Sequence, residues 1–210
     1  MNELLLALCV LLLGILLNVC TYKLSRKLSI LKPFSNLSRF LILELFTVLL
    51  ILWAYRVFGF NMEFFKSIFF ISILVIVSFI DYYYQIIPDK ILLWLAGVGI
   101  LLLLLTHNPL DKLMGSILGG ILMLLIAMTT RGGMGGGDIK FIAAIGLWLG
   151  VKFTFLTIFL SFLIGGFVSL LLIVSKQKSC RQSIPFGPFI AISAFVILLH
   201  GNTVLKYLIR

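Results

Sequence analysis

Charged residues are scarce in this chain, and acidic residues are fewer than basic ones. Only 11% of the 210 residues are charged, and just 7 of them are Asp or Glu. Soluble domains carry roughly 25% charged residues. With 62% hydrophobic residues and a mean hydropathy of +1.23, the composition excludes an ordinary water-soluble domain and indicates an integral membrane protein.

Cysteine and histidine are also rare, which limits the metal and redox chemistry to be expected. The three cysteines form no CxxC pair, and Cys9 and Cys20 lie in the first apolar run, where a thiol behaves as a small hydrophobe. His107 and His200 are isolated at predicted ends of spans, far from the acids. We therefore predict no disulfide, no metal site and no cofactor, and no serine or cysteine has an evident base partner for covalent catalysis.

Long apolar runs fill most of the sequence. Eight of them can be placed, at residues 4–22, 39–58, 63–81, 90–106, 112–129, 139–151, 153–175 and 186–203. Since a transmembrane helix needs about 20 apolar residues, we predict an all-α polytopic bundle of about eight transmembrane helices, forming one domain over residues 1–210. The sixth run is short and close to the seventh, so a count of seven stays open.

The basic residues predict how the bundle is oriented. The net charge of +10 could suggest nucleic acid, but the 17 basic residues are scattered through short breaks between apolar runs. We expect them to report topology and to touch anionic lipid headgroups, not nucleic acid. If the N-terminus lies outside, 11 basic residues face the cytoplasm and 6 face outward, the usual bias. Residues 81–90 and 131–140 then both face the cytoplasm.

Two aspartates stand where carboxylates are expensive. Asp81 closes the third apolar run, and Asp138 opens the sixth, directly after a glycine-rich stretch at residues 132–137. A charged side chain near the centre of a bilayer costs roughly 2.5 to 3.5 kcal/mol on insertion scales. Both residues are therefore candidates for function.

The chemistry of a carboxylate pair depends on the distance between its members. Two carboxylates from different helices that meet within a few ångströms cannot both ionise, so one pKa rises and the pair shares a proton. One can then act as a base on water while the other acts as an acid on the scissile carbonyl. The glycines would let an extended peptide approach closely. The pair predicts an aspartyl peptidase, and a proton-coupled transporter or channel is the alternative from another class.

Structural interpretations compete with these functional ones. Taken singly, Asp81 suits a helix end at the interface, and Asp138 suits an N-cap. For Asp89, which follows Pro88, capping of the fourth helix is the better interpretation. Glu44 lies inside the second run and resists a structural explanation, so it holds an internal polar contact or assists substrate binding.

Five motifs, in order along the chain, give the sequence a resemblance to the type IV prepilin peptidases, bacterial membrane aspartyl peptidases of the GxGD kind. The motifs are residues 14–19 (GILLNV), 39–45 (RFLILEL), 80–89 (IDYYYQIIPD), 133–140 (GMGGGDIK) and 184–189 (IPFGPF). Preflagellin and presenilin-like peptidases share the aspartate pair, but the second and fifth motifs favour bacterial prepilins.

The resemblance implies a function, a location and a set of site residues. It implies cleavage of the short basic leader from type IV prepilins or pseudopilins at the cytoplasmic face of the bacterial cytoplasmic membrane, in pilus assembly or protein secretion, with Asp81 and Asp138 catalytic. Residues with an implied substrate-binding or supporting role are Gly133, Gly135, Gly137, Lys140, Glu44, Pro185 and Gly187.

One departure from the family pattern limits what the resemblance implies. Many members carry a cytoplasmic domain with paired CxxC motifs between the first two helices, linked to zinc and to N-methylation with S-adenosylmethionine. Residues 23–38 contain no cysteine and leave no room for that domain. We therefore predict a peptidase without methyltransferase activity, and the oligomeric state stays open.

Overall fold

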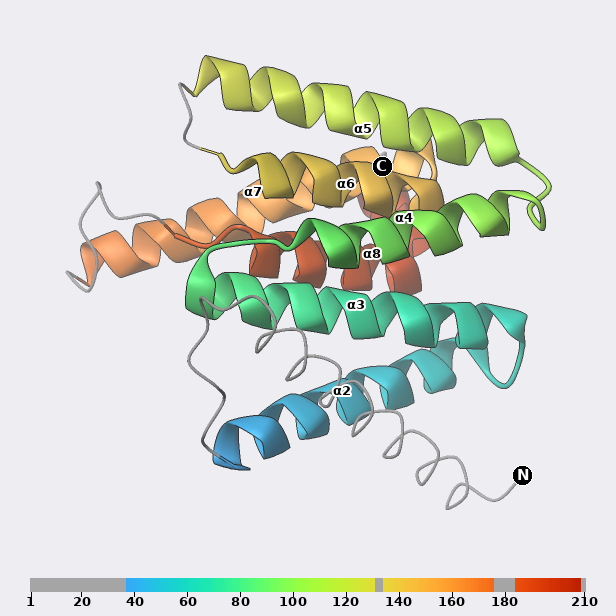
Figure 1. Cartoon of the computed structure of the whole chain (residues 1–210), viewed down its shortest axis with the longest axis horizontal. Helices are drawn as coiled ribbons and strands as arrows, with labels where there is room; N and C mark the ends of the chain where they lie inside the picture. Colours follow the sequence, from blue (N-terminus) through green and yellow to red (C-terminus); the bar gives the residue numbers. More distant parts are fainter. Residues whose placement is uncertain (1–36, 131–133, 176–183, 209–210) are drawn as a thin grey trace. The chain divides into compact units, whose positions relative to one another are not determined.

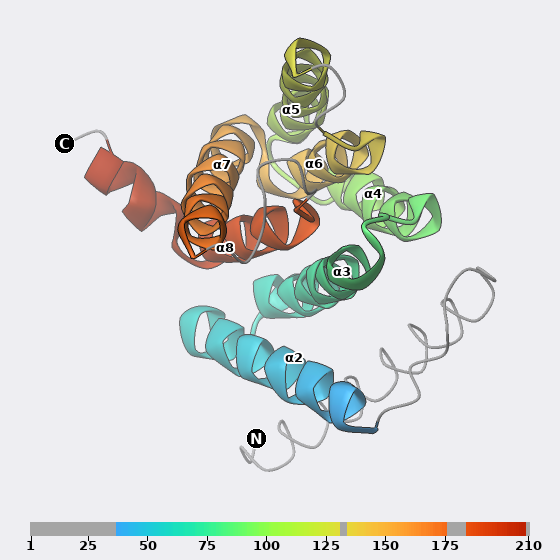
Figure 2. The same ribbon diagram turned by 90° about the vertical axis from the view of Figure 1, so that its left-hand side faces the viewer.

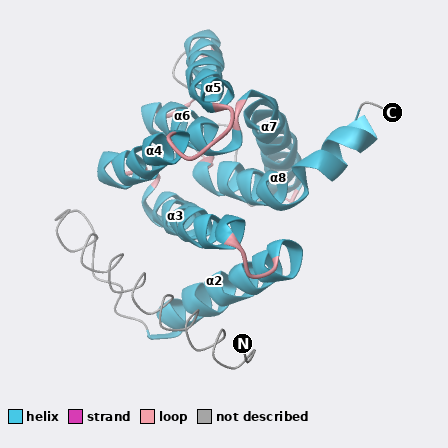
Figure 3. Ribbon diagram, turned by 90° about the vertical axis from the view of Figure 1, so that its right-hand side faces the viewer, coloured by secondary structure: helices cyan, strands magenta, loops and turns pink. Residues whose placement is uncertain are grey.

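The computed structural model describes residues 37–130, 134–175 and 184–208 (Figure 1). This part of the chain consists of α-helices joined by short loops, with no β-strand (Figure 3). The helices are α2 (Leu37–Phe58), α3 (Met62–Tyr84), α4 (Asp89–Leu103), α5 (Pro109–Thr129), α6 (Gly136–Leu149), α7 (Val151–Val174) and α8 (Gly187–Leu208). The all-helical prediction is confirmed for these residues, and the first predicted run, residues 4–22, lies outside them.

Proline and glycine set several helix limits. The chain is extended at Pro88, with ψ 125°, and α4 begins at the next residue. Pro109 occupies the first turn of α5, where its missing N–H removes no helical hydrogen bond. Gly150 separates α6 from α7 with a φ of 79° that other residues rarely adopt. The sixth and seventh predicted runs are therefore two distinct helices.

Four of the described helices are long and apolar enough to cross a membrane. They are Met62–Tyr84, Pro109–Thr129, Val151–Val174 and Gly187–Leu208. By contrast, α4 has 15 residues and α6 has 14, so at about 1.5 Å per residue each is shorter than a hydrocarbon core of about 30 Å. The last of the four, α8, is interrupted at His200, whose φ of −128° is not helical.

The chain divides into two compact units, residues 1–76 and 77–210. The described part of the first unit contains α2 and most of α3. Asn61 begins α3 by accepting a hydrogen bond from the N–H of Phe64 at 2.9 Å, as an N-cap residue does. Within this unit, the rings of Tyr55 and Phe64 meet edge to face, with centroids 5.4 Å apart.

Helix α6 is the centre of the second unit. It packs against α4, α5, α7 and α8, and Figure 2 shows it beside α4, α5 and α7. Its residues Phe141, Ile142 and Ile145 are fully buried. The approach to α5 is close, because a Cβ on Gly146 would lie 2.5 Å from the backbone of Gly115. Small residues at such crossings let membrane helices pack backbone to backbone.

The ends of several helices come together at one end of this second unit. The last turn of α3 and the first turns of α4 and α6 lie at the left of Figure 1, where α5 also ends. The sequence prediction that residues 81–90 and 131–140 face the same side requires such an arrangement. These helix ends form the candidate site.

Candidate active site

A pocket with a volume of about 390 Å³ opens where these helix ends meet. All its lining residues belong to the second unit. They are Asp81, Gln85, Ile126, Thr130, Met134, Gly135, Asp138, Phe162, Ile184, Pro185 and Phe186. The two carboxylate side chains are buried, with 6% of Asp81 and 8% of Asp138 exposed. Residues 57 positions apart in sequence thus share one pocket.

Asp81 is held by the start of another helix. The backbone N–H of Gly187 donates a hydrogen bond to Oδ2 of Asp81 at 2.8 Å. Gly187 is the first residue of α8, and the first N–H groups of a helix have no partner within it. Asp81 supplies that partner from the last turn of α3, and the positive end of the α8 dipole favours a negative charge there.

The contact between Asp81 and α8 requires glycine at position 187. A Cβ on Gly187 would lie 2.8 Å from Oδ2 of Asp81 and 3.0 Å from its Cβ and Cγ. These distances are shorter than the approach that a real methyl group accepts. The absence of a side chain at Gly187 is therefore what allows its N–H to reach the carboxylate.

Asp138 is presented from the first turn of α6. The N-cap residue of that helix is Gly135, so the interpretation of Asp138 as the N-cap is wrong. Asp138 instead occupies the third helical position and accepts a hydrogen bond from the backbone of Gly135. An acidic residue that reaches back from this position to the N-cap is one half of a capping box, and it fixes the side chain beside the pocket.

The electrostatic environment of Asp138 suits proton exchange near neutral pH. Asp138 lies outside the four helices that can cross a membrane. Burial, and secondly the nearby Asp81 carboxylate, raise the pKa of Asp138 from 3.8 to about 7, while the hydrogen bond from Gly135 opposes the rise. A carboxyl group with this pKa can hold a proton at neutral pH and also release it.

An ion pair joins the loop after Asp81 to α6. Nζ of Lys140 lies 2.8 Å from Oδ1 and 2.9 Å from Oδ2 of Asp89. The capping interpretation of Asp89 is wrong, because the N-cap of α4 is Pro88 and the Asp89 carboxylate is directed to Lys140. Asp89 therefore links the start of α4 to the first turns of α6.

The same loop also packs directly against the glycines of α6. A Cβ on Gly137 would lie 2.9 Å from Cβ of Ile87. Glycine at this position lets the buried side chain of Ile87 settle against the first turn of α6. The segment that follows Asp81 is thus packed one residue away from Asp138.

Another part of the pocket wall is apolar. It is formed by Ile126 of α5, Phe162 of α7 and the segment that precedes α8. The rings of Phe162 and Phe186 lie with their centroids 5.0 Å apart. The pocket therefore offers carboxylates to a reacting group and aromatic and aliphatic surface to an apolar side chain.

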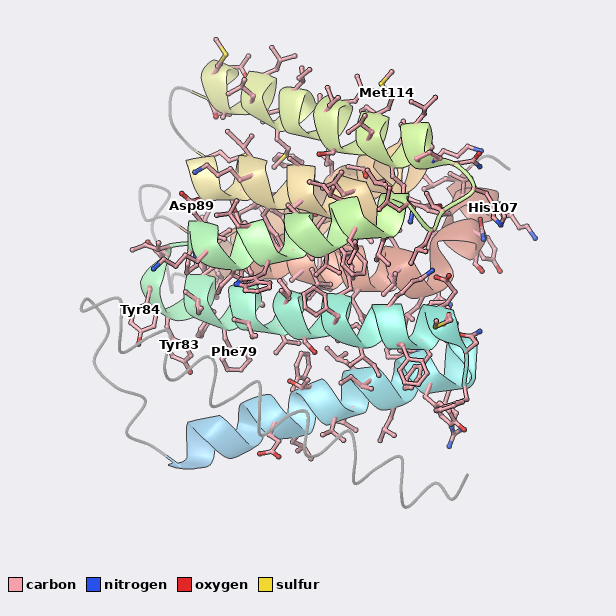
Figure 4. The ribbon with its side chains drawn as sticks, turned by 45° about the vertical axis from the view of Figure 1, so that its right-hand side comes forward. Phe79, Tyr83, Tyr84, Asp89, His107 and Met114 are labelled. Atoms are coloured by element: carbon pink, nitrogen blue, oxygen red, sulfur yellow. The ribbon has the colours of Figure 1, made fainter. Side chains whose placement is uncertain are left out.

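Aromatic side chains lie on one side of the last turns of α3 (Figure 4). Phe79, Tyr83 and Tyr84 project from its last turns, and Asp89 begins the next helix nearby, whereas His107 lies at the far end of α4 (Figure 4). His107 is thus distant from the acids, as predicted. Within the described part of the chain, no group of three His, Cys, Asp or Glu residues could hold a metal ion.

The supporting residues implied by the resemblance fall into distinct places. Gly135 and Pro185 line the pocket, while Gly187, Gly137 and Lys140 lie just behind it in the contacts described above. Glu44 is a half-buried residue of α2, in the other unit. The remaining one, Gly133, lies outside the described residues.

Several residues that line the pocket were not among the predicted site residues, and Gln85 and Phe162 show why. Gln85 follows Asp81 by four positions, a spacing that places both on one face of a helix, and this signal was available. Phe162 carried no signal, because it is one of 19 phenylalanines and lies inside an apolar run. Only the packing of α7 beside the acids identifies it.

Comparison with known proteins reveals similar chains. A model of the type IV leader peptidase family matches residues 68–170. Three similar proteins are each named prepilin leader peptidase/N-methyltransferase. The one from Bacillus subtilis (strain 168) is 35% identical over 80% of this chain and 68% of its own length. The protein from Legionella pneumophila is 33% identical over 84% of this chain and 63% of its own length. The protein from Xanthomonas campestris pv. campestris is 32% identical over 80% of this chain and 61% of its own length. No solved structure matches the chain significantly.

Proposed function

Because this chain belongs to the type IV leader peptidase family, we propose that it is a membrane-embedded aspartic endopeptidase that removes the short basic leader from type IV prepilins or pseudopilins. The observation that carries this proposal is the pair of buried carboxylates, Asp81 and Asp138, in one pocket. Ionised carboxylates are costly to bury, and an acid–base pair explains why both are there.

The two acids have different roles in the proposed mechanism. The pair shares one proton, and we assign it to Asp138, with Asp81 as the base, because the N–H of Gly187 and the start of α8 stabilise a negative charge on Asp81. Asp81 takes a proton from a water molecule as the water oxygen attacks the scissile carbonyl carbon, and Asp138 donates its proton to the carbonyl oxygen. The C–N bond then breaks as the leaving nitrogen takes the proton from Asp81, and one hydroxyl of the tetrahedral intermediate returns its proton to Asp138, which restores the starting state of the pair.

The shape of the pocket suits a substrate that is apolar on one side of the cut. The apolar wall formed by Ile126, Phe162 and Phe186 can receive the start of a hydrophobic helix while the acids reach the backbone. The glycine-rich start of α6 leaves room for an extended backbone, provided that the residue before the cut is small. The basic leader would stay in water or at anionic headgroups.

The proposed membrane topology includes more segments than the four candidate spans. We propose about eight membrane-embedded segments in a single domain over residues 1–210, with the N-terminus outside and cleavage at the cytoplasmic face of the bacterial cytoplasmic membrane. The distribution of basic residues, 11 inside against 6 outside, supports this orientation. The shared location of Asp81 and Asp138 supports cleavage at one face.

We also propose that this chain does not methylate its product. Its relatives, by contrast, are named as N-methyltransferases as well as leader peptidases. The support is the lack of cysteine in residues 23–38, where many members of the family carry paired CxxC motifs. Transfer of a labelled methyl group from S-adenosylmethionine to a cleaved pilin by the purified protein would refute this part of the proposal.

Carboxylate-to-amide substitutions test the proposed pair. Asp81→Asn and Asp138→Asn should each lower turnover of a prepilin by about 10²- to 10⁴-fold, because an amide cannot take or give the proton. Asp89→Asn is the matched control, since it removes an acid from the same segment but breaks only an exposed ion pair, worth about 0 to 1 kcal/mol. All three proteins should be inserted and folded.

Each outcome of this test has a definite meaning. Near-normal turnover by Asp81→Asn or Asp138→Asn would refute the catalytic assignment. If Asp89→Asn were as inactive as Asp81→Asn, the wrong acid would have been chosen in this segment. Proton-coupled transport by vesicles that contain the protein, without cleavage of any prepilin, would favour the transporter alternative.

A further inference from the structure

Helices α5 and α7 pack side by side in the second unit (Figure 2). A Cβ on Gly115 would lie 2.6 Å from the backbone of Gly150, directly before α7, and a Cβ on Gly119 would lie 2.6 Å from Cγ2 of Thr154. The contact thus advances by the same number of residues along both helices, so α5 and α7 run in the same direction. Both helices are long and apolar enough to cross a membrane.

The residues next to this contact turn to one side of the helix pair. Each step of one residue turns about 100° around an α-helix. The two parallel helices face each other at the contact, so one step back along α5 and one step forward along α7 lead to the same side. Leu118 precedes Gly119, and Phe155 follows Thr154. These two side chains therefore flank the contact on one side of the pair.

Two apolar rows continue from these residues along the helices, because spacings of four and three residues keep side chains on one face of a helix. The rows, together called the α5–α7 surface, are Leu118, Leu122 and Leu125 on α5 and Phe155, Phe159 and Phe162 on α7. The three phenylalanines are 37% to 52% exposed. Phe167, five positions after Phe162 and so outside the row, is 61% exposed. The row is thus partly covered, as side chains beside a neighbouring helix are.

The α5–α7 surface ends in the candidate active site. Phe162 lines the pocket that holds the two acids, and so does Ile126, which directly follows Leu125. Phe155 lies seven positions before Phe162, which corresponds to about 10 Å along α7. The surface therefore starts at the pocket and follows two membrane-crossing helices away from it.

We propose that the α5–α7 surface binds the apolar helix of a prepilin, the part of the substrate that follows the scissile bond. This inference rests on the proposed function, and it deepens it by giving a location to the rest of the substrate. A bond that is cut in the pocket ties the start of the apolar helix to the pocket, so the helix must leave along an adjoining surface that lies in lipid. The α5–α7 surface adjoins the pocket and belongs to two candidate spans.

The physics of helix association in lipid agrees with this choice of surface. Lipid tails are as apolar as the side chains of the surface, so close packing, and not removal from water, must stabilise the contact. Two rows of large side chains on adjacent helices can interdigitate with a third helix, as ridges fit into grooves. The substrate helix would start at the pocket and pass Phe159 toward Phe155, so it would run antiparallel to α7.

Site-specific cross-linking tests this location. A photoreactive analogue of phenylalanine replaces Phe155, Phe159, Phe162 or Phe167 in the full chain with Asp138→Asn, in vesicles that also contain a prepilin. We expect prepilin adducts from the first three positions and much weaker capture from position 167. Because both helices rise about 1.5 Å per residue, the prepilin residue captured from position 155 should lie about seven residues further from the cut than the residue captured from position 162.

Kinetic measurements use the same contrast between two phenylalanines of α7. Phe159→Ala should raise KM for a full-length prepilin by about 5- to 10-fold with kcat changed less than about twofold, because it removes a contact remote from the reacting atoms. For a peptide that ends a few residues after the cut, KM should change less than about twofold, since the apolar helix is absent. Phe167→Ala is the matched control and should keep the wild-type KM for both substrates.

The results separate this inference from the proposed function. Capture is measured in a variant that is expected not to cleave, so it decides the inference whether or not the wild type cleaves prepilins. Equal capture at positions 159 and 167, or the reverse order along the prepilin, overturns the inference. Cleavage of prepilins without capture at positions 155 and 159 would mean that lipid alone covers the surface, which also overturns it. Absence of cleavage by the wild type refutes the proposed function, even if the capture pattern is as expected.

Discussion

Replacement of Gly187 by alanine should disable the site by displacing the proposed catalytic group of Asp81, which the substitution does not alter chemically. The added Cβ would lie 2.8 Å from Oδ2 of Asp81 and 3.0 Å from its Cγ. Ordinary contacts between nonbonded heavy atoms are about 3.5 Å. The carboxylate or the start of α8 must therefore move by about 0.5 to 1 Å, and the 2.8 Å hydrogen bond from the Gly187 N–H is strained or lost.

The expected loss follows from that displacement. A misplacement of about 1 Å at a reacting group can cost about 10²-fold in rate, so we expect kcat to fall by about 10- to 100-fold. Overpacking of a buried site costs about 1 to 3 kcal/mol of stability. The protein should therefore remain folded in detergent, with a lower Tm and a much lower turnover.

A matched control and a double-mutant cycle test the reasoning. Gly166→Ala adds the same methyl group to α7, where it meets no atom within 4 Å, and it should keep wild-type turnover. The destabilisation caused by Gly187→Ala should shrink when Asp81 is already alanine, because Oδ2 and Cγ are then absent. Wild-type kcat in Gly187→Ala, or equal destabilisation in both backgrounds, would show that the contact with Asp81 does not position that acid.

Three further predictions concern pH, orientation and substrate. Burial and Asp81 raise the pKa of Asp138 from 3.8 to about 7, so the folded state binds this proton more tightly than the unfolded state, and stability should fall as pH rises between those values. Asp138→Asn should therefore raise Tm at pH 8 but not at pH 4, and the gain in the free energy of unfolding at pH 8 should be at most about 4 kcal/mol. An equal rise in Tm at pH 4 and at pH 8 would contradict this. In a chain freed of its own cysteines, Tyr84→Cys and Met134→Cys should react with an impermeant thiol reagent from the cytoplasmic side, and labelling only from outside would reverse the proposed orientation. Cleavage should decline steeply when the glycine before the cut is changed to alanine, valine and leucine, whereas efficient cutting after leucine would show that the pocket does not require a small residue.

The contacts behind the pocket suggest how its two acids keep their relative positions. Gly187 holds Asp81 from α8, and Ile87 packs on Gly137 in the first turn of α6. The exposed Asp89–Lys140 ion pair connects the same two segments, but it should add little energy of its own. Packing at glycines, more than the visible ion pair, is therefore what fixes the geometry of the site.

The sequence by itself determined the helices and the two candidate acids. Long apolar runs must satisfy their own backbone hydrogen bonds in lipid, so they predict helices with little ambiguity. The predicted runs agree with the seven described helices to within a few residues, apart from the break in α8 at His200. Asp81 and Asp138 stood out because ionisable residues beside such runs are few and costly.

Only the tertiary structure decided what each polar residue contacts. The partner of Asp81 is an N–H 106 positions away, and the partner of Asp89 is a lysine 51 positions away. The positive φ of Gln85, 54°, appeared only where α3 ends beside the pocket. Local periodicity sets which residues share a helix face, but contacts between helices depend on crossing positions and on glycines at the points of closest approach. For this reason the sequence predicted the acids correctly as neighbours but was wrong about capping by Asp89.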